Sequence, residues 1–311
     1  MRISKLTIIL GLLVGVAPDC WAQPTALTLK FPEGRKARYK HKFRVEYFSN
    51  MGEQIVMESG HIRVIIDNEW RSHEEVIVPQ ALPGRTIPEG VMGVRAEIKK
   101  GASAAIFLGE KQTYEQFPFT FDLFNDRVFT WQVTPEGVVQ KFEPDFPAFR
   151  VDRQDLITDM FQGAIPAFAP VLPEGPVNKG DTWTGERDFW RPFASMDMMG
   201  RDSQIKIKST YEVKNIKNEK GRVEVHIDEE SEVEYAGWVE VSVASLYYNG
   251  KGKGGGSWVI DATRGLVLEH KVHFDITKPV VIKAGKKDPI PNIVAEVKID
   301  MERKLEKLEK E

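Results

Sequence analysis

The sequence predicts a mainly β fold, made of two antiparallel β-sheet or half-barrel units joined by one amphipathic helix and a proline-rich linker. Three observations predict this fold. Apolar and polar residues alternate over most of the chain, turn-forming residues separate these runs, and only residues 152–166 show helical periodicity. We therefore expect a removable leader at 1–22, a first β-rich unit at 23–151, the helix and linker at 152–180, and a second β-rich unit at 181–311.

The first 22 residues have the features of a signal peptide. Two basic residues precede an apolar run over 6–17, and small side chains at Cys20 and Ala22 suit cleavage before Gln23. No apolar run reaches the roughly 20 residues that span a bilayer, so we expect no transmembrane segment in the mature chain. We expect the mature protein in the periplasm or outside the cell, soluble rather than anchored through a lipid on Cys20.

Composition narrows the expected chemistry. After cleavage 289 residues remain, with 41 basic and 45 acidic side chains and a net charge of −4. This mild acidity argues against a nucleic-acid partner, because phosphate binding needs clustered positive charge. The only cysteine lies in the leader, so the mature chain has no disulfide, no thiol nucleophile and no thiolate metal ligand.

Alternation predicts strands through the first unit. Residues 37–48 and 58–66 alternate between apolar and polar side chains, and we expect Asp67 and Asn68 to form a turn after the second run. The stretch 91–109 fits either two short strands around residues 99–101 or a strand and a helical turn.

Two aromatic stripes come next in the chain. Phe117, Phe119 and Phe121 alternate, and Phe129 and Trp131 do so after them. Such period-2 aromatics are typical of half-buried strands, where they pack into a core. Alternatively, the first stripe lines a cavity for an apolar ligand.

Residues 152–166 are predicted to form a helix. Asp152 suits the helix N-cap, an apolar face includes Met160 and Phe161, and a proline ends the segment. A short helix with so wide an apolar face must lie on a sheet or in a groove. If that groove accepts a ligand, we expect Met160 and Phe161 to face it, with Phe168 near its rim.

The second unit again reads as strands. We expect Gly180 in a turn and Trp183 largely buried where this unit begins. The expected strands are 204–213, 221–227, 233–248, 266–276 and 294–305. The hairpin after Trp131 resembles the one after Trp258, and each lies near the end of its half, so a duplicated unit is one interpretation.

The sequence contains short matches to chemical motifs, but their contexts fail. Gly250, Gly252 and Gly255 fit the spacing of a dinucleotide loop, yet a strand follows where that loop requires a helix. We expect these glycines instead to let another backbone approach the sheet or to let the strand bend. Ser103 falls in a partial nucleophile-elbow pattern, but the surrounding β/α order is absent.

We predict no metal site and no catalytic residue. His270 and His273 are three residues apart on an expected strand, so they point to opposite faces and cannot share a metal ion. Neither the loop methionines at 196–199 nor the pair His226 and Asp228 supplies a complete ligand set. The acidic run 228–234 is expected to be a solvated strand edge.

The linker carries a recognisable pattern. Residues 172–183 read LPEGPVNKGDTW. They resemble the LP-x-x-x-V-x-x-G-D-x-W signature of uncharacterised exported bacterial β-rich proteins, which also have a glycine-rich strand before an xD-x-x-x-G hairpin. Residues 252–265 correspond to that strand and hairpin. The resemblance implies an exported β-rich protein and assigns no catalytic residue.

The expected layout of long antiparallel strands with a helix against them is also similar to periplasmic lipid and lipoprotein carriers, whose curved half-barrel holds acyl chains. The function that we expect is non-catalytic: the binding of an apolar or amphiphilic ligand, or of an envelope partner, outside the cytoplasm. Two alternatives stay open: an exported hydrolase with an unrecognised site, and a purely structural envelope protein. We expect no cofactor.

Overall fold

The computed structural model describes residues 24–50, 61–79, 86–107, 110–112, 125–134, 139–144, 170–189, 204–219, 221–241, 244–283 and 290–310. These residues form twelve strands and no helix. The strands are β1 (Lys36–Asn50), β2 (His61–Ile77), β3 (Met92–Phe107), β4 (Glu110–Gln112), β5 (Val128–Val133), β6 (Val139–Pro144), β7 (Thr182–Phe189), β8 (Gln204–Glu219), β9 (Arg222–Val241), β10 (Ala244–Asp261), β11 (Leu266–Lys283) and β12 (Ile290–Lys310). The predicted mainly β class is thus confirmed for the described part of the chain.

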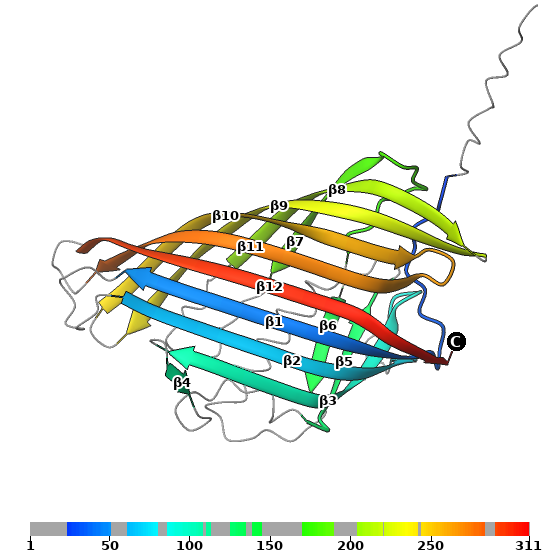
Figure 1. The fold of residues 1–311 in the computed structure, drawn as a ribbon, viewed down its shortest axis with the longest axis horizontal. Helices are drawn as coiled ribbons and strands as arrows, with labels where there is room; N and C mark the ends of the chain where they lie inside the picture. Colours follow the sequence, from blue (N-terminus) through cyan, green and yellow to red (C-terminus); the bar gives the residue numbers. More distant parts are fainter. Residues whose placement is uncertain are drawn as a thin grey trace, which may run out of the picture.

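All twelve strands belong to one antiparallel sheet. Its order is β6-β5-β3-β2-β1-β12-β11-β10-β9-β8-β7, with β4 pairing to β3 beside this path. Most neighbours in sequence pair with each other, but β3 also pairs with β5, β6 and β7 lie at opposite ends of the strand order, and β1 pairs with β12 along its whole length. Figure 1 shows that the sheet curls, so that β5, β6 and β7 lie behind the central strands β1, β12 and β11. Strands from both predicted units are therefore hydrogen-bonded into a single sheet.

Alternation of side chains gives this sheet one buried face, which we call the inner face. It carries Tyr39 and Phe43 of β1, Met301 of β12, Phe274 of β11 and Trp258 of β10, all at most 7% exposed. The opposite face is charged, because the intervening residues of the same strands are mostly Lys, Glu, Asp and Arg. Period-2 patterning of this kind sets the register of the strands, since a slip of one residue would expose the apolar set.

Two extended segments cover one end of the inner face. They are the N-terminal segment, residues 24–33, and the strap, residues 170–178. Thr25 and Val177 exchange two backbone hydrogen bonds of 2.8 Å, which join the two segments. Leu27, Leu29 and Val177 are buried in one cluster with inner-face residues of β8 to β11. The predicted linker is therefore part of the core packing.

The residues of the linker pattern each have a structural role. Gly180 has φ of +90°, the left-handed conformation expected of it. The backbone N–H of Asn178 donates to the Asp181 carboxylate at 2.7 Å, which closes the turn. Trp183 is partly rather than largely buried; its Nε1 donates to the Val171 carbonyl at 2.8 Å, and its ring stacks on Tyr211 at 5.3 Å.

In the first unit, the structure contradicts one local prediction and decides one alternative that the sequence left open. The expected turn at Asp67 and Asn68 is absent, because β2 runs through both residues and pairs with β1 on one side and β3 on the other. Ladder bonds on both sides outweigh the turn preference of these two residue types. The stretch 92–107 is one strand with a register shift, where Lys100 has φ of +51°.

The glycine-rich stretch is strand, as predicted from its context. On the inner face of β10, a Cβ at Gly256 would clash with the Lys271 carbonyl and the Val272 backbone of β11. A Cβ at Gly254 would clash with the His273 carbonyl and the Phe274 ring. The glycines thus allow β11 to approach β10 closely, which confirms the close-approach interpretation.

Several predictions concern residues outside the described part of the chain. They are the leader and Cys20, the 152–166 helix, and the six residues expected to line a ligand site. Those six are Phe117, Phe119, Phe121, Met160, Phe161 and Phe168. The helix, the division into two units and the ligand-lining role of these residues stay predictions.

Candidate ligand pocket

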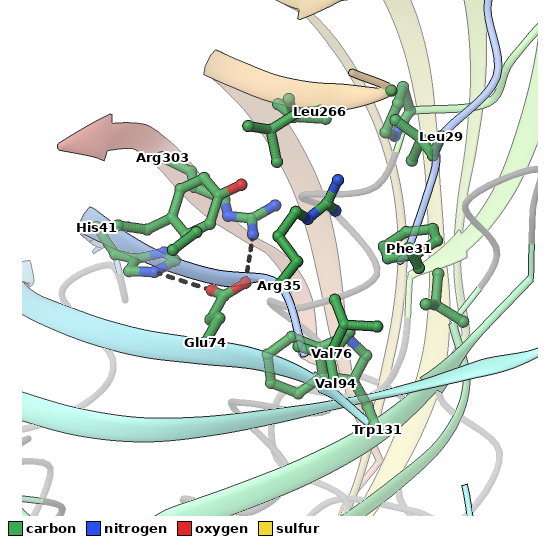
Figure 2. A pocket seen from close by; sticks show the side chains of 16 residues that line it. Leu29, Phe31, Arg35, His41, Glu74, Val76, Val94, Trp131, Leu266 and Arg303 are labelled. Atoms are coloured by element: carbon green, nitrogen blue, oxygen red, sulfur yellow. Dashed lines mark hydrogen bonds and ion pairs between the residues drawn. The ribbon is translucent and has the colours of Figure 1, made fainter. Parts of the chain in front are cut away.

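A pocket opens between the inner face and the N-terminal segment, with a cavity volume of about 90 Å³. Its walls come from β1, β2, β3, β5 and β12, from the turn that begins β11, and from the first residue of the strap. Figure 2 shows these side chains converging from strands far apart in the sequence. We call it the inner-face pocket.

Most of the lining is apolar. Val76, Val94 and Trp131 form one wall, and Leu29 and Leu266 lie across from them (Figure 2). These five side chains are each at most 9% exposed. Water held against such walls gains few hydrogen bonds, so an apolar group can displace it favourably.

Charged groups interrupt this apolar lining at one side. Arg303 of β12 donates from Nη2 to the Glu74 carboxylate of β2 at 2.7 Å, across the intervening strand β1. The guanidinium also lies over the ring of Tyr39, 3.8 Å from its centroid. Glu74 is 9% exposed, so this is a largely buried ion pair, which good geometry and further hydrogen bonds must stabilise against desolvation.

Arg35 supplies a second guanidinium to the same pocket. It precedes β1 and is 6% exposed. Its Nη1 donates to the Arg264 carbonyl at 3.3 Å, and the guanidinium lies 5.6 Å from the centroid of the Phe31 ring. Contacts with the N-terminal segment and with the turn before β11 therefore position this side chain at the pocket wall.

A hydrogen-bond chain continues from the ion pair into the sheet. Ser72 donates to Glu74 at 2.9 Å, and His41 Nε2 lies 2.8 Å from the Ser72 hydroxyl. Because the serine proton is directed at the carboxylate, His41 donates from Nε2. Burial, with a smaller effect from Arg303, holds the pKa of His41 well below its usual range, so the ring is neutral.

The hydrogen bonds that link His41, Ser72 and Glu74 superficially resemble a serine–histidine dyad but lack the features of one. Ser72 is 2% exposed and lies outside the pocket lining. Its strand is hydrogen-bonded on both sides, and its hydroxyl proton points at Glu74 rather than at His41. A nucleophile needs a base that accepts its proton and a path to substrate. The arrangement instead fixes Glu74 and so positions Arg303.

Burial also acts on Tyr39, whose ring lies under the Arg303 guanidinium. Burial raises the pKa of Tyr39 to about 12, while Arg303 and Arg35 act in the opposite direction. Both arginines are therefore close enough to affect the same phenol. The inner-face pocket thus combines apolar walls with two positive groups and one carboxylate among its described residues.

A second buried polar cluster lies further along the inner face. Glu229 of β9 is 2% exposed and pairs with Arg187 of β7. Its carboxylate also accepts from Trp258 Nε1 at 2.7 Å and from Ser209 and Ser231 at 2.8 Å. The predicted solvated edge over 228–234 is therefore wrong, because β9 pairs with both β8 and β10, and Glu229, Ser231 and Val233 are buried.

Stacked rings connect the two polar clusters. The rings of Trp70 and His41 stack at 4.8 Å, and those of Trp258 and His270 stack at 3.4 Å. His41 and His270 are both opposite Arg303 in the strand register. A row of aromatic and cationic side chains thus crosses five adjacent strands of the inner face.

The histidines on β11 point to opposite faces, as predicted. His270 is fully buried, and burial, with Arg187 and Arg303, holds its pKa well below the usual range. His273 lies on the charged face, with Nδ1 2.6 Å from Asp300 and Nε2 2.9 Å from Asp275. Within the described ranges, no group of three His, Cys, Asp or Glu side chains is placed to hold a metal ion.

Sequence reasoning did not single out the charged residues of the inner-face pocket. A usable signal was present, because His41 shares its parity with Tyr39 and Phe43, and Arg303 shares its parity with Met301. A polar residue at an apolar parity is a candidate buried site. Of the aromatics predicted to face a core, Phe129 is 1% exposed, and Trp131 lies in both the core and the pocket wall.

Comparisons with known proteins show no family for this chain. No protein family matches the sequence, and no curated protein does. One similar structure is titled as lipid–protein interactions in lipovitellin; its sequence is 10% identical to this chain, and the TM-score is 0.48. The match covers 90% of this chain but only 26% of that chain. An outer membrane channel from Pseudomonas putida F1 gives 8% identity and a TM-score of 0.16, and a mutant Rh. blastica porin gives 10% and 0.19.

The channel match covers 90% of this chain and 98% of the other, and the porin match 87% and 99%. These scores are too low to support an argument about function. In the part of the chain that the structure describes, no helix has the length and apolar character needed to cross a membrane.

Proposed function

We propose that this protein is exported and is a non-catalytic binding protein that holds a small apolar or amphiphilic molecule in the inner-face pocket. The observation that carries the proposal is the pocket itself: a cavity of about 90 Å³ with mostly apolar walls and a few converging polar groups. Such a combination is typical of small-molecule sites. The signal-peptide pattern of the first 22 residues supports export.

The position of the pocket also supports binding. One wall is the N-terminal segment, which is attached to the sheet through a few backbone hydrogen bonds, such as that from Lys30 N to the Gly265 carbonyl at 2.9 Å. The other walls belong to a sheet paired along its length. The pocket thus lies between a rigid sheet and a segment packed on it, and a site built on rigid elements keeps its shape without a ligand.

The binding proposal is tested by a substitution that fills the cavity. Ala37 lines the pocket and is 5% exposed, so Ala37→Leu adds three carbon atoms to the space that the ligand would occupy. We expect the wild type to bind a four-carbon probe, butanol or butyrate, saturably in calorimetric titration, and the variant to lose most of this binding. Its melting temperature should be unchanged or higher, because filling a cavity adds packing contacts.

Ala102→Leu is the matched control, because Ala102 is exposed on β3 and the same change is made there outside the pocket. It should bind the same probe as the wild type does. If the wild type binds neither probe, or if Ala37→Leu binds it unchanged, the binding proposal fails and a structural role in the envelope is favoured.

A further inference from the structure

We infer that the N-terminal segment is the gate of the inner-face pocket and opens about the turn of residues 32–35. This inference rests on the proposed binding function, since a gate has a role only where a ligand enters. Three features carry it: the place of the segment in the pocket wall, the attachment of its two ends, and the contact that holds its middle.

The segment is a part of the wall that can move without opening the sheet. Leu29 and Phe31 line the pocket, and most of the other described lining residues lie on β1, β2, β3, β5 and β12. Each of these five strands is hydrogen-bonded to a neighbour on both sides, so displacing one breaks a ladder. Phe31 packs against two core clusters, one from β8 to β11 and one from β3 and β5. Lifting the segment therefore uncovers the pocket.

The two ends of the segment are attached in different ways. At the turn, Gly34 has φ of +77°, and its N–H donates to the Val76 carbonyl at 2.8 Å. The Val76 N–H donates in return to the Arg35 carbonyl at 2.9 Å, which joins this end to β2. A few turn residues of this kind can absorb the dihedral change of a hinge. The other end is held by the two hydrogen bonds between Thr25 and Val177.

The middle of the segment is held by the turn between β10 and β11. The Lys30 N–H donates to the Gly265 carbonyl at 2.9 Å, and Lys30 Nζ donates to the Thr263 carbonyl at 3.0 Å. Within the described part of the chain, residues 24–31 thus form three backbone hydrogen bonds with other segments. A segment held by few bonds opens at a lower free energy than a strand paired on both sides. Burial of Leu27 and Leu29 keeps the gate closed at rest.

A cysteine inside the pocket measures opening without any ligand. The mature chain that we expect has no cysteine, so Ala37→Cys places its only thiol on the pocket wall, where Ala37 is 5% exposed. Methyl methanethiosulfonate, a small thiol reagent, reacts with this cysteine when the pocket opens. The measurement is the labelling rate of the folded mature chain, relative to that of the same chain unfolded in urea.

Loosening the segment should speed this labelling. In the Ala37→Cys chain, Leu27→Ala removes buried contacts of the segment and should raise the rate at least about tenfold. Val233→Ala is the matched control, because Val233 is 1% exposed on β9 and lies outside the described pocket lining and the cluster of Leu27. Its rate should stay within about twofold, since local opening does not follow the stability of the sheet. Equal acceleration in both variants would mean that the thiol reacts through unfolding of the sheet, which overturns the gate.

A second pair of variants acts on the middle contact. Gly265→Ala places a methyl group against the backbone of Thr28 and Lys30 and should also raise the rate at least about tenfold. Gly221→Ala is the control, because φ is +77° at Gly221 and +60° at Gly265, so both variants strain the backbone. No described atom lies within 4 Å of a Cβ at Gly221, so its rate should stay within about twofold.

A disulfide tests the gate in the opposite direction. Thr25 and Val177 form a hydrogen-bonded antiparallel pair, whose Cα atoms are about 5.5 Å apart, a spacing that a disulfide can bridge. In a chain that keeps Ala37, Thr25→Cys with Val177→Cys should slow the binding and release of butanol at least about tenfold when oxidised. Reduction should restore the wild-type rates, with the affinity unchanged throughout. NMR line-shape analysis of butanol measures these rates.

The outcomes separate the gate from the proposed function. If neither butanol nor butyrate binds the wild type, the binding function fails, and thiol labelling still decides whether the segment opens. If butanol binds but exchanges at the wild-type rate in the oxidised variant, ligands enter by another route and the inference is overturned. It is also overturned if Leu27→Ala and Gly265→Ala label no faster than their controls.

Discussion

Two buried ion pairs stand out at the scale of single residues. Arg303 pairs with Glu74 in the first half of the sheet, and Arg187 pairs with Glu229 in the second. Each glutamate also accepts from a serine two residues away on its own strand. Buried pairs of this kind contribute little net stability, but breaking one leaves an uncompensated charge. Only the first pair lines a pocket, so we assign the second a structural role.

The second pair gives a direct prediction. Arg187→Met leaves the Glu229 carboxylate charged in a dry environment and should lower the free energy of unfolding by about 3–5 kcal/mol. The double variant Arg187→Met with Glu229→Gln removes both charges but keeps an acceptor for Trp258 Nε1. It should be more stable than Arg187→Met alone, as measured by urea denaturation. A double variant that is less stable than the single one would contradict a charge-based penalty.

At the scale of elements, the strap and β10 show how short motifs shape the fold. The LP-x-x-x-V-x-x-G-D-x-W pattern closes a turn, pairs with the N-terminal segment and packs Trp183 on the sheet. The hairpin after β10 contacts the same segment, because a Cβ at Gly265 would meet the backbone of Thr28 and Lys30. Both motifs therefore have a structural explanation in the covering of the inner face.

Trp183 tests the attachment of the strap. Trp183→Ala removes the stacking on Tyr211 and the hydrogen bond to Val171, yet the residue is only partly buried. We expect a loss of roughly 2–3 kcal/mol, below the 3–5 kcal/mol typical of fully buried aromatics. Trp183→Phe keeps a ring and should cost about 1 kcal/mol for the hydrogen bond alone. Thermal denaturation of both variants checks this order, and equal losses would show that the stacking contributes nothing.

Gly256 tests the close approach of β10 and β11. Gly256→Ala places a methyl group against the Lys271 carbonyl and the Val272 backbone, and backbone atoms in paired strands cannot move aside. We expect at least about 2 kcal/mol of destabilisation, as for other overpacked sites. Gly175→Ala is the matched control, since no atom lies within 4 Å of its added Cβ. Its stability should stay within about 0.5 kcal/mol of the wild type.

At the scale of the whole molecule, pairing of β1 with β12 joins the start and the end of the described chain. This contact spans the largest sequence separation in the sheet, and it aligns His41 with Arg303 and so brings the charged side of the inner-face pocket together. Loop closure over such a separation is slow compared with hairpin formation. The pocket therefore exists only once β12 has paired with β1.

The stability of the folded sheet should depend on pH, because two histidines are buried in it. The folded-state pKa values of His41 and His270 are lowered, chiefly by burial, below the unfolded value of about 6.5. As pH falls below about 6.5, the unfolded chain binds protons that the folded chain excludes, so stability falls. Each histidine contributes at most about 1.4 kcal/mol per pH unit in that range.

Denaturation between pH 7.5 and 5.5 measures this effect. His41→Gln and His270→Gln should each flatten the dependence of the unfolding free energy on pH, whatever their effect at pH 7.5. His273 gives a control of opposite sign. Burial lowers its pKa, but hydrogen bonds to Asp275 and Asp300 outweigh burial and raise it. Its small stabilisation is present below about pH 6.5 and is lost as pH rises through the folded-state pKa, so His273→Gln should steepen the acid loss. Unchanged slopes in all three variants would exclude these histidines as the cause.

Patterns in the sequence determined the β class, the parity of the buried residues and the turns at Gly180 and Gly265, because these depend on neighbours a few residues apart. They could not determine that β1 pairs with β12, since strand order depends on contacts between distant segments. Asn68 illustrates the difference: its residue type favours a turn, but pairing on both sides keeps it in β2. The sequence could not predict the candidate pocket for the same reason. Arg35, Glu74 and Arg303 meet only when β1 pairs with both β2 and β12, and a sequence shows parity along one strand but not proximity across several.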